Sequence, residues 1–197
     1  MVVNTYKNIQ LLDAEFDNSY PKRYQELSKI HWTPIEIVKL SVQWLSHKTN
    51  TNILDIGSGI GKFCIVGSLI SNAKFTGVEI RETLVDEAQK VKKKFKTDNV
   101  KFLNENITDV SFNDYNSFYY YNPFCEQIAT ADWIDKTLKF SEIKFNQYKE
   151  HVRQQLKKAL IGSRVVIYCS DNDVIPEGYS LSNIGYEGQL QLWIKKH

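Results

Sequence analysis

A glycine-rich turn preceded by an acidic residue is the part of this sequence best suited to binding a ligand. Residues 52–63 read NILDIGSGIGKF, an apolar run that leads directly into Gly57, Gly59 and Gly61. Glycines at such a turn allow a sharp bend and let backbone N–H groups approach a ligand closely. Asp55 lies just before the turn, where its carboxylate suits a ligand with an ammonium group and would repel a pyrophosphate.

A second acidic residue follows at an informative distance. Glu79 comes 20 residues after Gly59, near the end of another apolar run. That is the offset at which an acid accepts both ribose hydroxyls of a nucleotide in this type of α/β architecture. A nicotinamide dinucleotide would require a third glycine where this chain has Lys62, so a nicotinamide-dependent oxidoreductase is disfavoured.

The cysteines and histidines form no metal-binding or disulfide pattern. Cys64, Cys125 and Cys169 are widely spaced without a C-x-x-C pair, and the four histidines contain no i,i+4 pair. An odd number of separated cysteines suits reduced thiols in a cytosol. We therefore expect no structural or catalytic metal, and we expect a cytoplasmic protein.

Short apolar runs alternate with helical patterns along most of the chain, which is typical of a parallel sheet covered by helices on both faces. The expected strands are residues 53–56, 75–80, 100–103, 117–121 and 164–169. Two further runs, 179–181 and 189–194, are too close for a crossover helix and must pair antiparallel. The predicted fold is α/β: a three-layer αβα sandwich around a seven-stranded, mostly parallel sheet with an antiparallel last strand.

Length and composition indicate one domain. The chain has 197 residues, of which 42% are hydrophobic and 24% charged, as in ordinary globular proteins. We expect residues 33–197 to form the domain and residues 1–32 to form a cap or lid. The aromatic residues Tyr20, Tyr24 and Trp32 are candidates for covering a ligand.

The start of the domain carries a helix signal. Thr33-Pro34-Ile35-Glu36 predicts Thr33 as the N-cap, Pro34 as the first helical residue and Glu36 as the partner of the cap. The N-terminus lacks the apolar core of a signal peptide, and no stretch approaches the ~18 apolar residues that span a membrane. We therefore expect no membrane association.

The glycine turn and its acids resemble two motifs of a known family. Residues 54–61, LDIGSGIG, and residues 77–80, GVEI, look like motifs I and II of the class I S-adenosylmethionine-dependent methyltransferases. The resemblance extends from about Thr33 to the C-terminus and includes the Rossmann-like sheet predicted above. It implies methyltransferase activity with S-adenosyl-L-methionine as cofactor.

The resemblance also implies where the cofactor lies. The glycine loop would pass under its methionine part with Asp55 close by, Glu79 would hold the ribose, and Ile80 would pack on the adenine. Asn106 stands where the family often has an aspartate for the adenine edge, and Glu105 is the neighbouring alternative. The implied cofactor-binding residues are Asp55, Gly57, Ser58, Gly59, Gly61, Glu79, Ile80, Asn106, Ile107 and Asn122.

Asn122, Pro123 and Phe124, at the end of the fourth expected strand, are the predicted catalytic residues. Amino-methylating members of the family carry an Asn or Asp, a proline and an aromatic residue at this point. A nucleophilic amine needs acceptors for its N–H groups, which the Asn122 carbonyl would provide, while Phe124 would stack on the target or line its pocket. The plainer alternative is that Asn122 and Pro123 simply end the strand and turn the chain.

The methyl acceptor is not specified by these residues. Members that methylate nucleobases or glutamine usually have two consecutive prolines, whereas this chain has Pro123 alone; Asn-x-Phe also resembles the seven-strand histone lysine methyltransferases over a few residues. We expect a nitrogen acceptor on a small molecule or a protein side chain. The alternatives are an RNA methyltransferase and a cofactor-binding domain without catalysis. A net charge of +2 and the absence of aromatic–basic interleaving do not favour nucleic acid.

Overall fold

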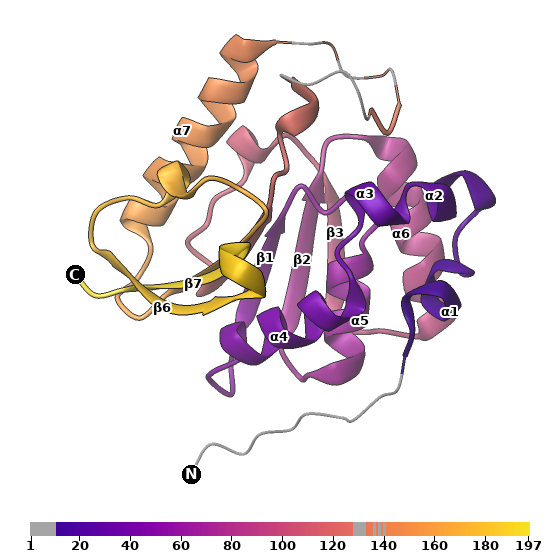
Figure 1. Ribbon diagram of the computed structural model, residues 1–197, viewed down its shortest axis with the longest axis horizontal. Coiled ribbons are helices and arrows are strands. Elements are labelled where there is room, and N and C mark those ends of the chain that lie inside the picture. The colour runs from indigo at the N-terminus through magenta and orange to yellow at the C-terminus, as the bar shows by residue number, and fades with distance from the viewer. Residues whose placement is uncertain (1–10, 128–132, 136, 138, 140) are drawn as a thin grey trace.

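One mixed sheet forms the centre of the molecule. The computed structural model describes residues 11–127, 133–135, 137, 139 and 141–197, and among these seven strands pair in the order β3-β2-β1-β4-β5-β7-β6 (Figure 1). The strands are β1 (Asn52–Ile56), β2 (Lys74–Glu79), β3 (Val100–Asn104), β4 (Ser117–Tyr121), β5 (Arg164–Tyr168), β6 (Tyr179–Gly185) and β7 (Leu190–Lys195). Strand β7 is antiparallel to β5 and β6, and the other neighbouring pairs are parallel. The predicted fold class is confirmed.

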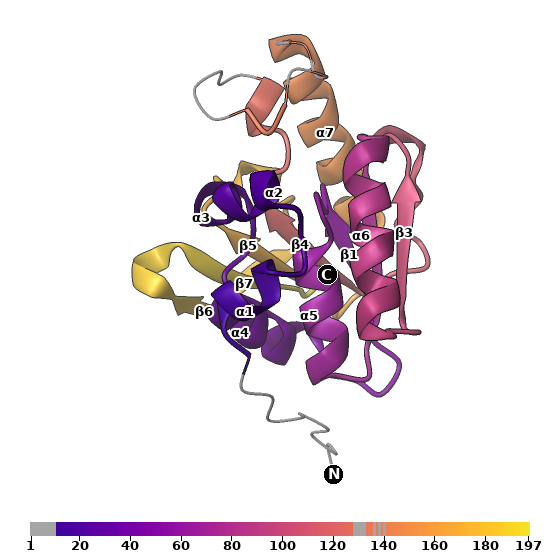
Figure 2. The ribbon, with the colours of Figure 1, turned by 90° about the vertical axis from the view of Figure 1, so that its right-hand side faces the viewer.

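Helices cover both faces of the sheet. The helices α4 (Ile35–Leu45), α5 (Lys62–Ile70) and α6 (Glu82–Phe95) lie on one face, and α7 (Glu142–Lys158) lies on the other (Figures 1 and 2). Side chains of β1 alternate between the two cores, since Ile53 packs with the α4–α6 layer and Leu54 with the α7 layer. Burial on both faces explains why the parallel strands read as continuous apolar runs.

The start of α4 differs from the prediction. The helix begins at Ile35 with Pro34 as N-cap and without a side-chain cap. The Thr33 hydroxyl instead pairs with the Tyr119 hydroxyl at 3.0 Å, and the Ile35 N–H donates to the Asp13 carboxylate at 3.1 Å. The prediction of Thr33 as N-cap was wrong because an aspartate from a distant segment satisfies the first exposed N–H of the helix.

The segment before α4 packs against the glycine-turn side of the domain. It contains three short helices, α1 (Asp13–Asp17), α2 (Lys22–Glu26) and α3 (Ser28–His31) (Figure 2). Tyr20, Tyr24 and Trp32 are buried; the Tyr20 hydroxyl donates to the Ile60 carbonyl at 3.0 Å, and the Trp32 indole N–H donates to the Tyr24 carbonyl at 2.7 Å. Residues 1–10 of the expected cap lie outside the described residues, and the role of the segment as a lid stays a prediction.

None of the helices that the structure describes combines the length and the apolar character that crossing a membrane requires.

Candidate functional site

Two adjoining cavities lie at the carboxyl ends of β1, β2 and β4, the edge of an α/β sheet where ligands bind. The larger has a volume of about 330 Å³ and the smaller of about 40 Å³. Among the described residues, five line both cavities: Gly57, Glu79, Arg81, Pro123 and Glu126. A ligand that occupies both cavities therefore passes between these five residues.

The glycine turn forms one wall of the larger cavity. Gly57 and Gly59 have φ angles of +75° and +52°, a conformation that side chains rarely adopt. A Cβ on Gly57 would lie 2.4 Å from Cβ of Pro123, and a Cβ on Gly59 would lie 2.7 Å from the ring of Trp32. These contacts make both glycines necessary for the backbone to lie this close to the neighbouring segments.

Asp55 contributes a buried carboxyl group to the larger cavity. Its side chain is 3% exposed, and the Cys64 thiol lies 3.4 Å from its Oδ2. Burial raises the pKa of Asp55 to about 7; the nearby Glu79 carboxylate adds to the rise, and the Cys64 contact opposes it. A cationic group in the cavity would stabilise the ionised form of Asp55. The ionised carboxylate would bind that cation more tightly than the neutral carboxyl group would.

Glu79 belongs to a chain of three buried charged residues. Its carboxylate accepts the Gly59 N–H at 3.2 Å, the Arg81 N–H at 2.9 Å and the Arg81 Nε–H at 3.1 Å. The other side of the Arg81 guanidinium donates from Nη2 to Glu126 at 2.9 Å. Burial alone would lower the pKa of Arg81, but the Glu79 and Glu126 carboxylates raise it, so the guanidinium stays charged.

The smaller cavity is bordered by the residues predicted to surround an adenine. Ile80, Asn106 and Ile107 line it, and Ile80 is 41% exposed. The Asn106 carbonyl oxygen accepts from the Thr108 N–H at 3.1 Å and from the Thr108 hydroxyl at 3.0 Å. Both lone pairs of the Asn106 carbonyl are therefore occupied. Glu105 lines the same cavity, and it is the better candidate for contacting an adenine amino group because the Asn106 carbonyl is already in use.

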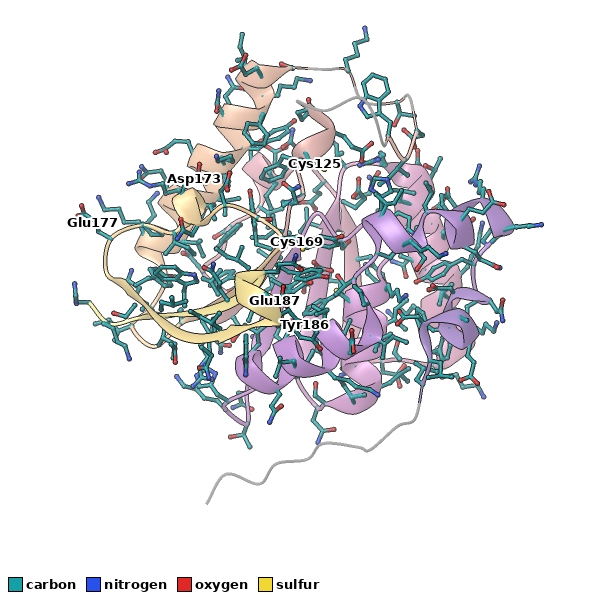
Figure 3. The ribbon with its side chains drawn as sticks, viewed as in Figure 1. Cys125, Cys169, Asp173, Glu177, Tyr186 and Glu187 are labelled. Atoms are coloured by element: carbon teal, nitrogen blue, oxygen red, sulfur yellow. The ribbon has the colours of Figure 1, made fainter. Side chains whose placement is uncertain are left out.

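Asn122 lies where the larger cavity continues into an open groove. It lines both, together with Cys169, and the groove has a volume of about 410 Å³. The φ angle of Asn122 is +39°, and its N–H donates to the Ser170 hydroxyl at 2.6 Å. Exposed Asp171 and Glu187 also line the groove, and Figure 3 places Glu187 and Cys169 close together in front of the sheet.

Phe124 lies at the smaller of the two cavities. It lines that cavity, with its ring 5.2 Å from that of Tyr148 and 6.0 Å from that of Tyr120. The larger cavity, beside Asn122, does not include it among the described lining residues. The role of Phe124 beside an acceptor stays a prediction.

The two other predicted residues of the glycine turn differ in their positions. Gly61 lines neither of the two cavities as the described residues define them; a Cβ there would lie 2.4 Å from the Phe102 ring, so this glycine allows close packing of α5. Ser58 lines the larger cavity, and its N–H donates to the Val78 carbonyl at 2.8 Å. Its hydroxyl lies beside Gly77 of β2 and has no hydrogen-bond partner among the described residues.

Several residues of the site were not found from the sequence. Arg81 and Glu126 were not predicted. The position of Arg81, two residues after Glu79 at the end of β2, was a signal that could have indicated it. Lys62 was noted only as a departure from a dinucleotide motif; it is 2% exposed and pairs with Asp13 at 2.6 Å and Asp17 at 2.8 Å. Pairing across more than 40 residues leaves no local pattern to detect.

Comparison with known proteins agrees with this geometry. Residues 47–139, slightly under half of the chain, match the model of a family described as a methyltransferase domain. No curated protein sequence matches the chain significantly.

Solved structures share the fold at low sequence identity. An RNA methyltransferase from Salinibacter ruber, in complex with S-adenosyl-L-homocysteine, is 18% identical over 84% of this chain and 94% of that chain, with a TM-score of 0.61. The magnesium protoporphyrin IX methyltransferase of Synechocystis PCC 6803 with bound SAM is 14% identical over 96% and 100%, with a TM-score of 0.61. TrmN from Thermus thermophilus is 13% identical over 88% of this chain, with a TM-score of 0.64, and the match spans 52% of that longer chain.

Residues 47–139 therefore resemble a methyltransferase domain, and the chain has the Rossmann-like fold of the class I S-adenosylmethionine-dependent methyltransferases. The fold implied by the resemblance of the glycine turn and acidic residues to that family is confirmed.

Proposed function

We propose that this protein is an S-adenosylmethionine-dependent methyltransferase that transfers a methyl group to a nitrogen atom of a small molecule or a protein side chain. The observation that carries the proposal is the pair of adjoining cavities, which share Gly57 of the glycine turn and Glu79, with Asp55 lining the larger one. A cofactor with an ammonium group at one end and an adenine at the other matches this distribution of charge and apolar surface.

The residues present fit that cofactor. Asp55 would pair with its ammonium group, Glu79 would accept from its ribose, and Ile80 and Ile107 would pack on its adenine. Glu105, which lines the smaller cavity, would offer a carboxylate to the adenine edge in place of the Asn106 carbonyl, which accepts from Thr108. When bound, the cofactor supplies an electrophilic methyl group; the chain itself binds, orients and excludes water.

The acceptor side of the site supports a nitrogen that carries N–H groups. Asn122 offers a side-chain carbonyl as hydrogen-bond acceptor at the border of the larger cavity and the groove. By accepting an N–H of the nitrogen, Asn122 would leave the nitrogen lone pair free to face the methyl group that the bound cofactor would supply. Trp32 and Tyr121 line the same cavity and give it an aromatic wall.

Nucleic acid is the less favoured acceptor. Asp171 and Glu187 line the groove beside Asn122, and carboxylates there would repel a phosphate backbone. A cationic or neutral amine would meet no such repulsion.

The proposal is tested by incubating the protein with methyl-labelled S-adenosylmethionine and three panels of acceptors: amines, proteins and RNA. We expect S-adenosylhomocysteine to form in the presence of an amine or a protein, with the label on nitrogen. Label transfer to RNA alone would contradict the proposed acceptor class. Tight binding of S-adenosylmethionine without methyl transfer to any panel, or to the acceptors in a cell extract, would favour the alternative of a binding domain without catalysis.

A further inference from the structure

The buried guanidinium of Arg81 has a donor that the protein leaves unused. Arg81 is 8% exposed, and its Nη1 atom has no hydrogen-bond partner among the described residues. Its Nε and Nη2 atoms are both bound, to Glu79 and Glu126. Buried polar groups are nearly always hydrogen-bonded, so an unused buried donor that borders a cavity is a sign of a missing ligand atom.

The number of hydrogen bonds that Glu79 can still accept also points to a second residue that binds the ligand. A carboxylate offers about four lone-pair positions, and three N–H groups, one from Gly59 and two from Arg81, already donate to Glu79. About one position is left. Glu79 can therefore take one ribose hydroxyl without losing an existing hydrogen bond, but it cannot take both.

Glu126 has the capacity that Glu79 lacks. Among the described residues, its two oxygens accept one N–H each, from Arg81 at 2.9 Å and from Ile134 at 3.1 Å; these contacts leave about two lone-pair positions. Glu126 is 7% exposed and lines both cavities, as Glu79 and Arg81 do. All three residues thus border the passage between the two cavities.

We propose that Arg81 and Glu126 are positioning residues that hold one ribose hydroxyl of the cofactor, while Glu79 holds the other. This inference rests on the proposed function, since it concerns the same cofactor. The hydroxyl on the Arg81 side accepts from Nη1 and donates to Glu126, so the Nη1 atom, which has no partner among the described residues, gains one when the ligand is bound.

The same residues link the ribose to the rest of the larger cavity. Glu126 fixes the backbone of Ile134, which lines that cavity, and Arg81 joins Glu126 to the end of β2. A ribose held by Arg81 therefore strengthens the contact between the glycine-turn side of the site and the segment after β4.

The test combines changes in the protein with changes in the ligand. Calorimetry on the full chain would measure the affinities of S-adenosylhomocysteine and of its 2′-deoxy and 3′-deoxy counterparts for wild type and for Arg81→Met. For wild type, we expect each deoxy ligand to bind about tenfold more weakly or worse, because each hydroxyl bonds a charged group.

For Arg81→Met, we expect a loss of affinity whose size depends on the ligand. Its affinity for S-adenosylhomocysteine should fall about tenfold or more, whereas its affinity for the deoxy ligand that lacks the Arg81-bound hydroxyl should change little. An equal loss for all three ligands would show that Arg81 acts only on the structure of the site, and would overturn the proposal.

Two further variants distinguish the loss of a contact with the ligand from a folding defect. Arg81→Lys keeps the charge but loses the planar set of donors, so it should give the same pattern with a smaller loss. Arg153→Met removes a partly exposed arginine from α7 and should bind all three ligands like wild type.

If wild type itself fails to bind S-adenosylhomocysteine, the proposed function and this inference are both contradicted. If wild type binds and the losses in Arg81→Met are equal for the three ligands, only this inference is contradicted.

Discussion

Asp55 and Glu79 are the residues on which the proposed chemistry depends most, and they are held in different ways. Asp55 is buried with a thiol as its polar neighbour, so its ionised form is poorly stabilised. Glu79 accepts from three N–H groups and lies beside a guanidinium. At neutral pH, Asp55 is the group of the pair whose charge a ligand can change.

The first prediction concerns stability and pH. The pKa of Asp55 is about 7 in the folded chain and about 3.9 when unfolded, so the folded chain binds more protons and loses stability as the pH rises through 7. Asp55→Asn removes this penalty; we expect it to melt at a higher temperature than wild type at pH 8, with a smaller difference at pH 5. The exposed Asp86→Asn is the matched control, and a difference independent of pH would contradict the assignment.

The same titration affects ligand binding. At pH 6.5 much of Asp55 carries a proton, which a cationic ammonium group would displace. We expect S-adenosylhomocysteine to release up to one proton on binding, measured from calorimetric enthalpies in two buffers of different ionisation enthalpy. Asp55→Asn should abolish the release; an unchanged release in that variant would place the titrating group elsewhere.

Glu79→Gln tests the ribose carboxylate. The change removes a charged acceptor from a buried hydrogen bond, and we expect binding of S-adenosylhomocysteine to weaken by about 1.5–3 kcal/mol. Isothermal titration measures the loss, and Glu82→Gln at the exposed start of α6 is the control. Wild-type affinity in Glu79→Gln would remove Glu79 from the site.

Asn122 is predicted to act on the acceptor and not on the cofactor. Its φ angle of +39° would strain an alanine, so glycine is the cleaner replacement. We expect Asn122→Gly to lower kcat while the affinity for S-adenosylhomocysteine stays within about twofold. Equal losses in turnover and cofactor affinity would assign Asn122 to the cofactor pocket.

At the scale of elements, the segment before α4 and the helix after the glycine turn are joined by a buried cation. Lys62, the first residue of α5, pairs with Asp13 and Asp17 of α1, and Asp13 also binds the N–H of Ile35 at the start of α4. The Trp32 ring lies directly over Gly59. The position of the segment over the glycine turn thus depends on these charges as well as on aromatic packing.

Lys62→Met tests that dependence. Removing one partner of a buried ion pair leaves uncompensated carboxylates, and we expect a loss of about 3–5 kcal/mol in the free energy of unfolding. Urea unfolding followed by tryptophan fluorescence measures it. Lys90→Met removes a pair on the exposed face of α6 and should cost much less stability, because exposed ion pairs contribute little; equal losses in the two variants would contradict the structural role of Lys62.

The elements also show what the sequence could and could not predict. The strands and the antiparallel hairpin followed from apolar runs and from the short connection before β7, because those signals are local. The actual N-cap of α4, the buried pairing of Lys62 and the Glu79–Arg81–Glu126 chain were missed, since each depends on contacts between distant segments. The sequence also did not show that Phe124 lines the smaller cavity and Asn122 the larger one, because a turn, unlike a strand, does not fix the direction of the next side chain.

The whole molecule presents its candidate site at one edge of the sheet, where the ends of β1, β2 and β4 meet residues from both the first and the last part of the chain. Trp32 lines the larger cavity, and so do Cys125, Glu126 and Ile134, which follow β4. The groove lined by Asp171 and Glu187 lies next to Asn122, on the side of β5 and the last hairpin. In the proposed function, this arrangement would give the cofactor and the acceptor separate approaches to the site.

The most direct test of the central claim is a calorimetric titration of the wild-type chain with S-adenosylmethionine and S-adenosylhomocysteine, with a nicotinamide dinucleotide as control. We predict micromolar binding of one equivalent of either adenosyl ligand and no binding of the dinucleotide. No binding of the adenosyl ligands, or tighter binding of the dinucleotide, would contradict the proposed function.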